Sequence, residues 1–464
     1  MNADPLPATG DESSSSVAST TAQAPPSPAP RAESTAPEPI EITAPFGPAP
    51  PTVPPTVPAP FAPGQPPPPE RWWIMRELQG TWLGALLDDN RLYFSGWTEM
   101  SYTASTSRVS NLPVAFNDRA NTFLLQQQWF RLDRPIVAAG TTEPSWGYHL
   151  DVLVGSDYRW TLIRGLFNYQ LDNSTGAQNL YGVDPIQLYT NVNFPTLFRG
   201  TEIRGGRTYN PWGYESLEAV STPLLSRSYA FFNTPFTVMG VGAYTTFSSE
   251  WSGIFVLTNG NDTFLKPYGE ARMFGKLTYA SANQHDNVQL GWTLGRGRFN
   301  AGAPFNPATV SLAQEPVGHN NFNAFDVVYT HVFNPVFTYA NETMYAWQTA
   351  VPASNFPIVN TGSIVVSGPP YPGTAHWASS CHYFRFNLTE HVSSILRVET
   401  FDDFNAQRTG FRGLYTAVTG GLQFRPRKGV IIRPELRYDY NGQSRAFEGK
   451  HGQFLAASDL ILRW

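Results

Sequence analysis

One stretch of this chain concentrates charged side chains that could select among small solutes by their charge. Charged residues make up only 14% of the sequence, yet segment 202–229 (EIRGGRTYNPWGYESLEAVSTPLLSRSY) carries several of them. Charged side chains at the narrow point of a water-filled channel discriminate among solutes by electrostatics and size. The segment therefore predicts constriction residues, with a salt-bridge cluster that braces a loop as the alternative. The predicted constriction residues are Arg204, Arg207, Glu215, Glu218 and Arg227.

A second set of charges alternates with apolar residues, as the two faces of a strand require. In 430–440 (VIIRPELRYDY), the charged residues share one face and most of the apolar and aromatic residues take the other. We predict that this face, and the equivalent faces of 270–280 and 394–404, line an interior wall. Paired charges that brace the wall are favoured there over a solute site. The predicted wall residues are Arg272, Lys276, Arg397, Glu399, Arg433, Glu435, Arg437 and Asp439.

Catalytic and metal-binding patterns are weak in this sequence. It contains no HExxH, P-loop or GxSxG motif. His376 and His382 would share a strand face, but they would lie about 20 Å apart, too far to share a metal ion. We predict no enzyme, no catalytic residue, no metal site and no cofactor. A Ser–His pair assembled across strands, which would give a lipid hydrolase, is the minor alternative.

The composition restricts the fold class. Aromatic residues make up 14% of the chain and the mean hydropathy is −0.28. No apolar run is long enough for a transmembrane helix, which needs about 18 residues or more. Alternating apolar residues never form such runs, so the composition is typical of a transmembrane β-barrel. A soluble β-sandwich is the alternative, but its outward face would be rich in Lys, which is scarce here.

The alternation continues from Arg91 to the C-terminus, with turn signals such as TNGND (258–262) and YNGQ (440–443) between the segments. Single-chain bacterial barrels use even strand numbers, so we predict an all-β fold: a closed antiparallel barrel of about 16 strands (range about 14–18) over residues 91–464. The predicted strands are 92–103, 121–132, 146–157, 184–194, 199–209, 237–247, 250–258, 270–280, 287–297, 323–333, 336–348, 378–388, 394–404, 412–425, 430–440 and 454–464.

The front of the chain differs from the rest. Residues 1–70 contain 21 of the 41 prolines, which predicts a disordered or polyproline arm. The arm is either an inert linker or a spacer that contacts the cell wall. In 71–90 (RWWIMRELQGTWLGALLDDN), apolar residues recur every three or four positions, which predicts one short amphipathic helix at the barrel mouth or in its lumen. The first ten residues lack the features of a signal peptide, which counts against export.

Aromatic residues near strand ends suit the two interfaces of a bilayer, where Trp and Tyr are enriched. The final segment FLAASDLILRW (454–464) also alternates, and it ends on an aromatic residue with no polar tail behind it. A strand that closes a barrel cannot fray, which explains such an ending. The predicted belt residues include Trp97, Trp251, Trp292, Tyr438 and Trp464.

Several phrases of the sequence resemble the OmpL-like outer-membrane proteins of β-barrel porin family 2. They are YFSGWTEMSYT (93–103), LPVAFNDRANTFLLQQQWFRLDR (112–134), YHLDVLVGSDYRWT (148–161), EIRGGRTYNPWGYESLEA (202–219) and SRSYAFFNTPFTVMGVG (226–242). The resemblance implies an outer-membrane barrel of porin type. In such barrels the last strand carries a signal for the assembly machinery, which Leu460, Leu462 and Trp464 match and Ser458 matches poorly.

These expectations combine into a passive channel for small hydrophilic solutes or ions in a bacterial outer membrane. The alternative is a plugged structural or adhesive barrel whose Pro-rich arm engages the cell wall or a partner. The expected partners are outer-membrane lipid, the barrel-assembly machinery and the permeating solutes. The net charge of −5 gives no indication of nucleic-acid binding, and the residues predict no particular oligomeric state.

Overall fold

The chain from residue 71 onward folds mainly into strands. The computed structural model describes residues 71–464, apart from 138–139, 164–165, 168–169, 171–179, 262–263, 265–270, 296–321, 350–355, 361–362, 368–373 and 407. The predicted Pro-rich arm, residues 1–70, lies outside the described residues. The strands are β1 (Tyr93–Ser105), β2 (Thr122–Arg134), β3 (Ser145–Gly155), β4 (Gly182–Phe194), β5 (Thr201–Tyr209), β6 (Thr237–Thr246), β7 (Trp251–Asn261), β8 (Arg272–Ala280), β9 (Asp286–Gly295), β10 (Asn323–Val332), β11 (Phe337–Thr349), β12 (Phe356–Asn360), β13 (Ser363–Ser367), β14 (Thr374–Asn387), β15 (Val392–Asp403), β16 (Gly413–Arg427), β17 (Val430–Asn441) and β18 (Gly452–Arg463).

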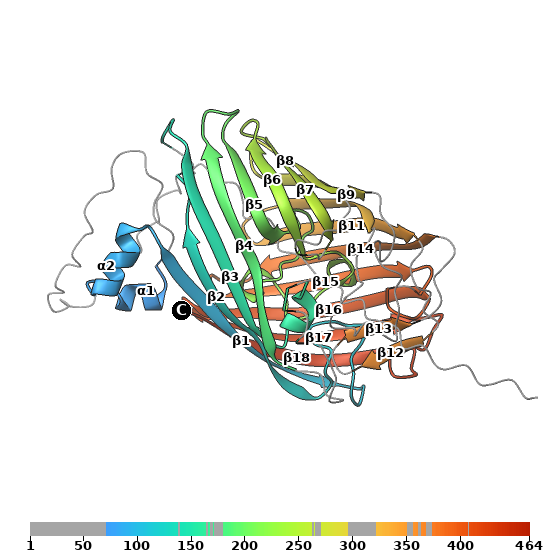
Figure 1. The fold of residues 1–464 in the computed structure, drawn as a ribbon. Helices are drawn as coiled ribbons and strands as arrows, with labels where there is room; N and C mark the ends of the chain where they lie inside the picture. Colours follow the sequence, from blue (N-terminus) through green and yellow to red (C-terminus); the bar gives the residue numbers. More distant parts are fainter. Residues whose placement is uncertain are drawn as a thin grey trace, which may run out of the picture.

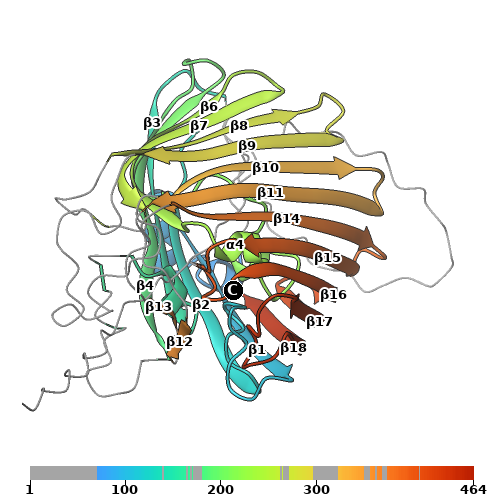
Figure 2. The ribbon, with the colours of Figure 1, turned by 90° about the vertical axis from the view of Figure 1, so that its right-hand side faces the viewer.

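Sixteen of these strands form one closed barrel (Figures 1 and 2). Neighbouring strands pair antiparallel in chain order, and β1 pairs with β18 to close the ring. β12 and β13 form a separate two-stranded hairpin, so β11 pairs directly with β14. The closed ring confirms the predicted barrel and strand number, and it excludes the soluble sandwich.

Side chains alternate between the two faces of the wall, as the period-two pattern predicts. In β17, Ile432, Leu436 and Tyr438 are exposed on the outer face, whereas Arg433 and Arg437 are buried on the inner face. The outer faces of β3 and β9 are likewise apolar at their centres. A barrel with apolar residues outside and charges inside is suited to a bilayer, because hydrocarbon cannot hydrogen-bond to a charged group.

The connections between strands differ at the two ends of the barrel. Short turns such as 247–250 and 428–429 lie at the end where β1 begins and β18 ends, and longer connections such as 106–121 and 210–236 lie at the other. In bacterial single-chain barrels the short turns face the periplasm and the long connections face outward. The long connections are therefore the segments with enough chain to fold back into the barrel.

Short helices occur outside the strands, where the sequence interrupts the alternation. In place of the single helix predicted over 71–90, two helices form, because Gly80 adopts a positive φ of 81° and Thr81 caps the second one through its side chain. Among the described residues, no helix is long and apolar enough to cross a membrane. The helices are α1 (Trp73–Glu77), α2 (Trp82–Asp89), α3 (Tyr158–Thr161), α4 (Tyr229–Phe232) and the 3-10 turn η2 (Ala219–Ser221).

The two N-terminal helices lie outside the barrel, beside the start of β1 and the C-terminus (Figure 1). α1 packs against β1 through the buried Met75. The Arg463 guanidinium lies 3.9 Å from the centre of the Trp72 ring, in cation–π geometry. These contacts place α1 at the end of the barrel that carries the short turns.

The prediction that Trp97 belongs to an interface belt is wrong. Trp97 is 2% exposed and faces the interior, where its ring stacks on Trp129 with centroids 4.6 Å apart. Its indole nitrogen donates a hydrogen bond to Gln127 at 2.9 Å. Trp97 lies two residues before Glu99, so the alternation of β1 puts both on the inner face. By contrast, Trp251 and Tyr438 are exposed on the outside.

Because the outer surface faces lipid, we expect a single charged substitution there to lower the stability of the barrel strongly. We expect Leu436→Arg to destabilise the barrel by about 2–4 kcal/mol, the cost of an arginine on the lipid face near the bilayer midplane. Urea unfolding in phospholipid vesicles, followed by tryptophan fluorescence, measures this change. Leu436→Ile is the control. Equal stability of the two variants would contradict the assignment of this face to lipid.

Candidate functional site

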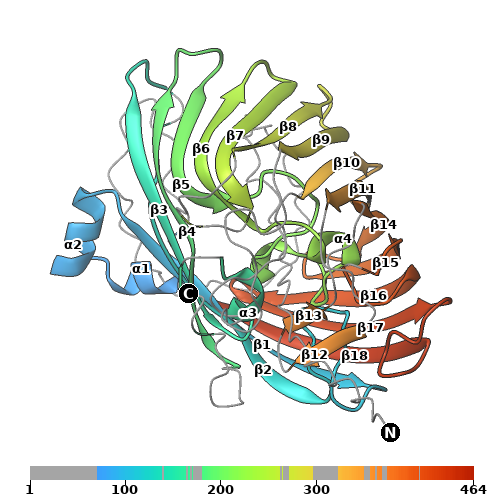
Figure 3. The same cartoon turned by 45° about the vertical axis from the view of Figure 1, so that its right-hand side comes forward.

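The connection between β5 and β6, residues 210–236, folds into the barrel, and we call it the inward segment. Figure 3 shows its helix α4 inside the ring of strands, and α4 contacts β11, β14 and β15. Its sequence explains this position. Trp212, Leu217 and Phe231 are at most 2% exposed, and such an apolar connection is stable only when it packs against a wall.

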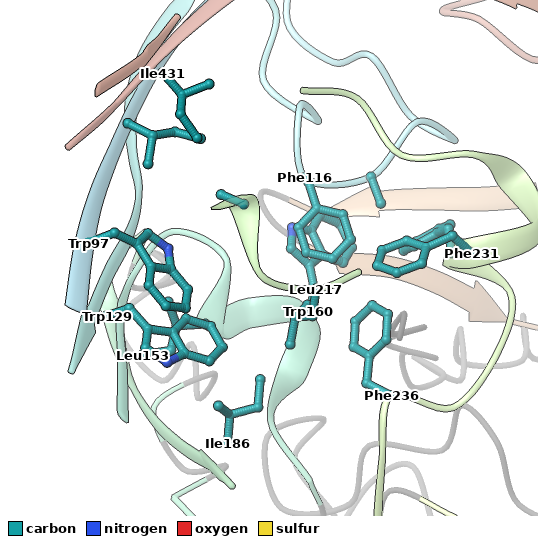
Figure 4. Close-up of a cluster of buried hydrophobic side chains, with 14 of the residues drawn as sticks. Trp97, Phe116, Trp129, Leu153, Trp160, Ile186, Leu217, Phe231, Phe236 and Ile431 are labelled. Atoms are coloured by element: carbon teal, nitrogen blue, oxygen red, sulfur yellow. The ribbon is translucent and has the colours of Figure 1, made fainter. Parts of the chain in front are cut away.

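An aromatic cluster joins the inward segment to one side of the barrel (Figure 4). Trp97 and Trp129 of the wall contribute to it, and Phe231 and Phe236 of the inward segment lie with ring centroids 5.4 Å apart. Phe116 and Trp160 reach the cluster from two other long connections. Part of the barrel interior is therefore a packed hydrophobic core rather than open lumen.

Charged wall residues on the other side bind the backbone of the inward segment. Arg433 donates to the carbonyls of Ala219 and Thr222 at 2.9 and 2.8 Å. Glu435 accepts from the amides of Leu225 and Ser226 at 2.9 and 3.1 Å. A hydrogen bond to a charged group contributes about 1.5–3 kcal/mol, and an unsatisfied buried backbone group would cost a similar amount. These contacts hold the segment in one place.

The same pattern extends to the neighbouring wall charges. Arg397 donates to the carbonyl of Ser226 at 2.7 Å and to Glu215 at 2.8 Å. Glu399 accepts from the amide of Tyr229 at 2.6 Å. Arg437 donates to the carbonyl of Arg227 at 2.6 Å and to Asp439 at 2.8 Å. All of these charged side chains are buried, as expected of braces.

Three of the predicted constriction residues belong to the inward segment and are engaged in its anchoring. Glu215 is buried and also accepts from the Tyr383 hydroxyl at 2.9 Å. Glu218 pairs with Arg131 at 2.5 Å. Arg227 donates to the carbonyl of Leu217 at 3.1 Å, and burial lowers the pKa of its guanidinium from the ordinary value.

The other two predicted constriction residues lie on β5. Arg207 is fully buried and pairs with Asp184 at 2.6 Å. Arg204 pairs with Glu202 at 2.6 Å, and its guanidinium lies 4.0 Å from the centre of the Tyr244 ring. The five residues are therefore distributed over several separate contacts, and the structure does not bring them together into one ring.

Arg272 and Lys276, the remaining predicted wall residues, both lie on the inner face of β8 and are buried. Arg272 donates to Asn323 at 3.0 Å and to the carbonyl of Phe322. Lys276 interacts electrostatically with Asp326 of β10. Both side chains thus face the barrel interior.

A polar cavity of about 240 Å³ separates the inward segment from the wall of β9, β10, β14 and β16. One water molecule needs roughly 10–15 Å³ of such volume, so the cavity holds on the order of ten waters or more. None of the five predicted constriction residues lines it. Its lining is Gly213, Tyr214, Val220, Ser221, Thr222 and Pro223 from the inward segment, and Gln289, Thr330, Arg385, Gln423 and Arg425 from the wall.

Two of the lining residues, Arg385 and Arg425, are cationic. The Arg385 side chain donates to Asn387, a neutral partner, at 3.1 Å. Arg425 is exposed, and its side chain forms no hydrogen bond or ion pair with any residue that the structure describes. No Asp or Glu is present in the described lining of the cavity. The cavity is therefore a polar space large enough to hold water, with positive charge on its wall.

Sequence reasoning missed both arginines because it searched for clusters of charge. Arg385 lies in HYFRFN and Arg425 in LQFRPR, each without an acidic neighbour. The signal that could have found them is alternation. Arg385 shares a strand face with Tyr383, and Arg425 with Gln423, and both faces point inward.

Comparison with protein families finds one that matches nearly all of the barrel. The family model described as "Putative beta-barrel porin-2, OmpL-like" matches residues 91–463. This range begins just before β1 and ends with the last residue of β18. A comparison with curated proteins finds no match.

Solved structures of low sequence identity share the general outline. The outer membrane channel DcaP of Acinetobacter baumannii has a TM-score of 0.49 at 10% identity, over 80% of this chain and 97% of that one. OprB of Pseudomonas putida has a TM-score of 0.49 at 11% identity, over 82% and 96%. Salmonella typhi OmpF, solved with daunomycin, has a TM-score of 0.47 at 11% identity, over 81% and 99%.

The anchoring contacts predict different roles for two wall arginines. We expect Arg433→Met to destabilise the barrel by about 3–5 kcal/mol, because removal of one partner leaves the buried Glu99 and Asp459 carboxylates unpaired. Arg425→Met is the matched control, and we expect no measurable change because this exposed side chain forms no ion pair among the described residues. Urea unfolding of the two variants side by side is the test. An equal loss in both would contradict the bracing role of Arg433.

Proposed function

The chain belongs to the OmpL-like β-barrel porin family, and on that basis we propose that it is a passive channel for small hydrophilic solutes or ions in a bacterial outer membrane. The observation that carries the proposal is the polar cavity between the inward segment and the wall. Diffusion needs a continuous polar route through the apolar bilayer, and a polar barrel interior supplies one. The proposed activity is transport and not catalysis.

In this proposal the cavity is the narrow part of the solute route. It lies between backbone and hydroxyl groups of the inward segment on one side and Gln289, Thr330 and Gln423 on the other. Such neutral polar groups exchange hydrogen bonds with water and solutes without trapping them. Tyr214 contributes a hydroxyl, and burial raises its pKa to about 12, so it stays neutral at physiological pH.

The charged residues predicted from the sequence take two roles in this proposal. Glu215, Glu218 and Arg227 set the width of the route by fixing the inward segment. The charged wall residues of β15 and β17 bind the inward segment and so take part in the same contacts. Lys276, Arg204 and Arg272, on the inner face away from those braces, remain candidates for contact with solutes beyond the cavity.

We also propose that the final strand carries the assembly signal. Leu460 and Leu462 share the outer face of β18, and Trp464, the residue after this strand, lies against Phe94 with ring centroids 5.7 Å apart. A partner that reads this strand before the barrel closes would find these side chains on one edge. Outer-membrane lipid would cover them afterwards.

A plugged anchor is the second candidate function, and one observation favours it. The inward segment and parts of two other long connections fill one side of the interior with a packed core. If the remaining space were also closed, the barrel would serve as a platform for its Pro-rich arm, which would engage the cell wall or a partner. Conductance separates this anchor from a channel.

The test is single-channel recording in a planar bilayer with the full chain, after heat-modifiable gel mobility has verified folding. A channel gives stable conductance steps. A plugged anchor inserts and stays silent, and that result would overturn the proposed transport function.

If solutes pass through the cavity, a bulky side chain introduced there should reduce the conductance. Thr330 of β10 lines the cavity, and we expect Thr330→Trp to reduce the single-channel conductance at least twofold by occupying part of its roughly 240 Å³ volume. Val327→Trp is the matched control, because Val327 lies on the same strand but is exposed on the outer face. If both variants conduct like the unmodified protein, the solute route does not pass through this cavity.

A further inference from the structure

The arginines of the barrel interior differ in their partners: some are buried against backbone carbonyls or amides, as Arg227 and Arg272 are, and the largest group has carboxylate partners. Most of them pair with a carboxylate within 3 Å, so their charge is already neutralised inside the protein. The pairs include Arg131–Asp151, Arg159–Asp118, Arg204–Glu202, Arg207–Asp184, Arg397–Glu215, Arg433–Asp459 and Arg437–Asp439. A neutralised pair attracts a passing ion weakly, since the fields of its two charges largely cancel.

Arg385 and Arg425 form a separate group. Neither side chain contacts a carboxylate among the residues that the structure describes, and both line the cavity. The nearest acidic residues of the inward segment, Glu215 and Glu218, are committed to Arg397 and Arg131. The positive charge of the two arginines is therefore directed at the water in the cavity.

The two arginines are close enough to act on one solute. They lie on β14 and β16, which are separated only by β15. The register places Arg385 opposite Ile395 and Ile395 opposite Gly421, so Arg425 lies four residues further along β16 and the two backbones are roughly 16 Å apart. Both long side chains reach the same cavity. Arg425 is repelled electrostatically by both Arg385 and Arg433. An anion between Arg385 and Arg425 would relieve this repulsion, and a guanidinium group can bind carboxylate or phosphate oxygens in a bidentate manner.

We propose that Arg385 and Arg425 form an anion-selective site in the solute route, which favours small solutes that carry a carboxylate or phosphate group. This inference rests on the proposed channel function and specifies its substrate class. The cavity supplies the other needs of such a site. It is large enough for an anion together with several waters, and the described lining holds no carboxylate to repel the anion.

The test is the reversal potential of single channels under a KCl gradient, compared between the unmodified full-length protein and the Arg385→Gln/Arg425→Gln double variant. We expect the unmodified channel to prefer chloride. A unit charge about 4 Å from an ion in water changes the occupancy of that position by the ion about fivefold, so we expect the double variant to lose about fivefold or more of the chloride preference. Arg76→Gln is the control for removal of a charge outside the solute route and matches the single Arg425→Gln variant in net charge, because exposed Arg76 lies in α1, outside the barrel.

A second readout tests binding. Inorganic phosphate added to the chloride solution should reduce the chloride current of the unmodified channel and of Arg76→Gln, and should have little effect on the double variant. Arg425→Gln alone gives an intermediate effect and guards against a folding defect in the double variant, since Arg425 is exposed and holds no structural contact.

The outcomes separate this inference from the proposed function. Folded protein without conductance overturns the channel itself. Channels that conduct but show no anion preference, or whose preference and phosphate block survive the double substitution, overturn the anion site and leave the channel standing. Equal losses in the Arg76 control and the double variant would also overturn it, because the effect would then reflect net charge alone.

Discussion

The interior of this barrel depends on the ion pairs around Arg433. Its guanidinium joins Asp459 of β18 and Glu99 of β1, and it also binds two carbonyls of the inward segment. One side chain on β17 therefore links the strands at the closing seam to the segment that fills the lumen. Burying an arginine is costly unless every donor is used, and here each nitrogen has an acceptor. Closure of the ring and placement of the inward segment are thus coupled.

The rest of the interior follows from where backbone polar groups can find partners. A connection that leaves the strands and enters a barrel loses its hydrogen bonds to water. On the β15–β17 side, charged wall residues replace that water. On the β1–β4 side, aromatic packing around Trp129 and Phe236 supplies the stabilisation. Where the inward segment faces Gln289, Thr330, Arg385 and Gln423 of the wall, a polar cavity remains between them. The position of the inward segment thus accounts both for the charged contacts on one side of it and for the cavity on the other.

This division explains why charges that cluster in the sequence become partners of one another in the fold. Charges that cluster along a chain tend to find one another when it folds, as Arg204 does with Glu202 and Arg437 with Asp439. A charge that is available to a solute must instead lack a partner. Arg385 and Arg425 have no acidic residue near them in the sequence, and neither side chain contacts a carboxylate among the described residues.

The sequence by itself determined the wall of this protein. Period-two alternation decided the number and approximate limits of the barrel strands and the inward direction of residues such as Arg433 and Lys276, because a strand side chain has only two directions available. It failed where a local signal competes with the pattern: Gly80 divides the predicted helix, and Trp97 follows the alternation of β1 rather than the preference of tryptophan for an interface. Only the tertiary structure decided which charges pair across strands, where the inward segment lies and which arginines remain free. Those outcomes depend on contacts between residues as distant in the chain as Glu215 and Arg397, and no local pattern encodes such distances.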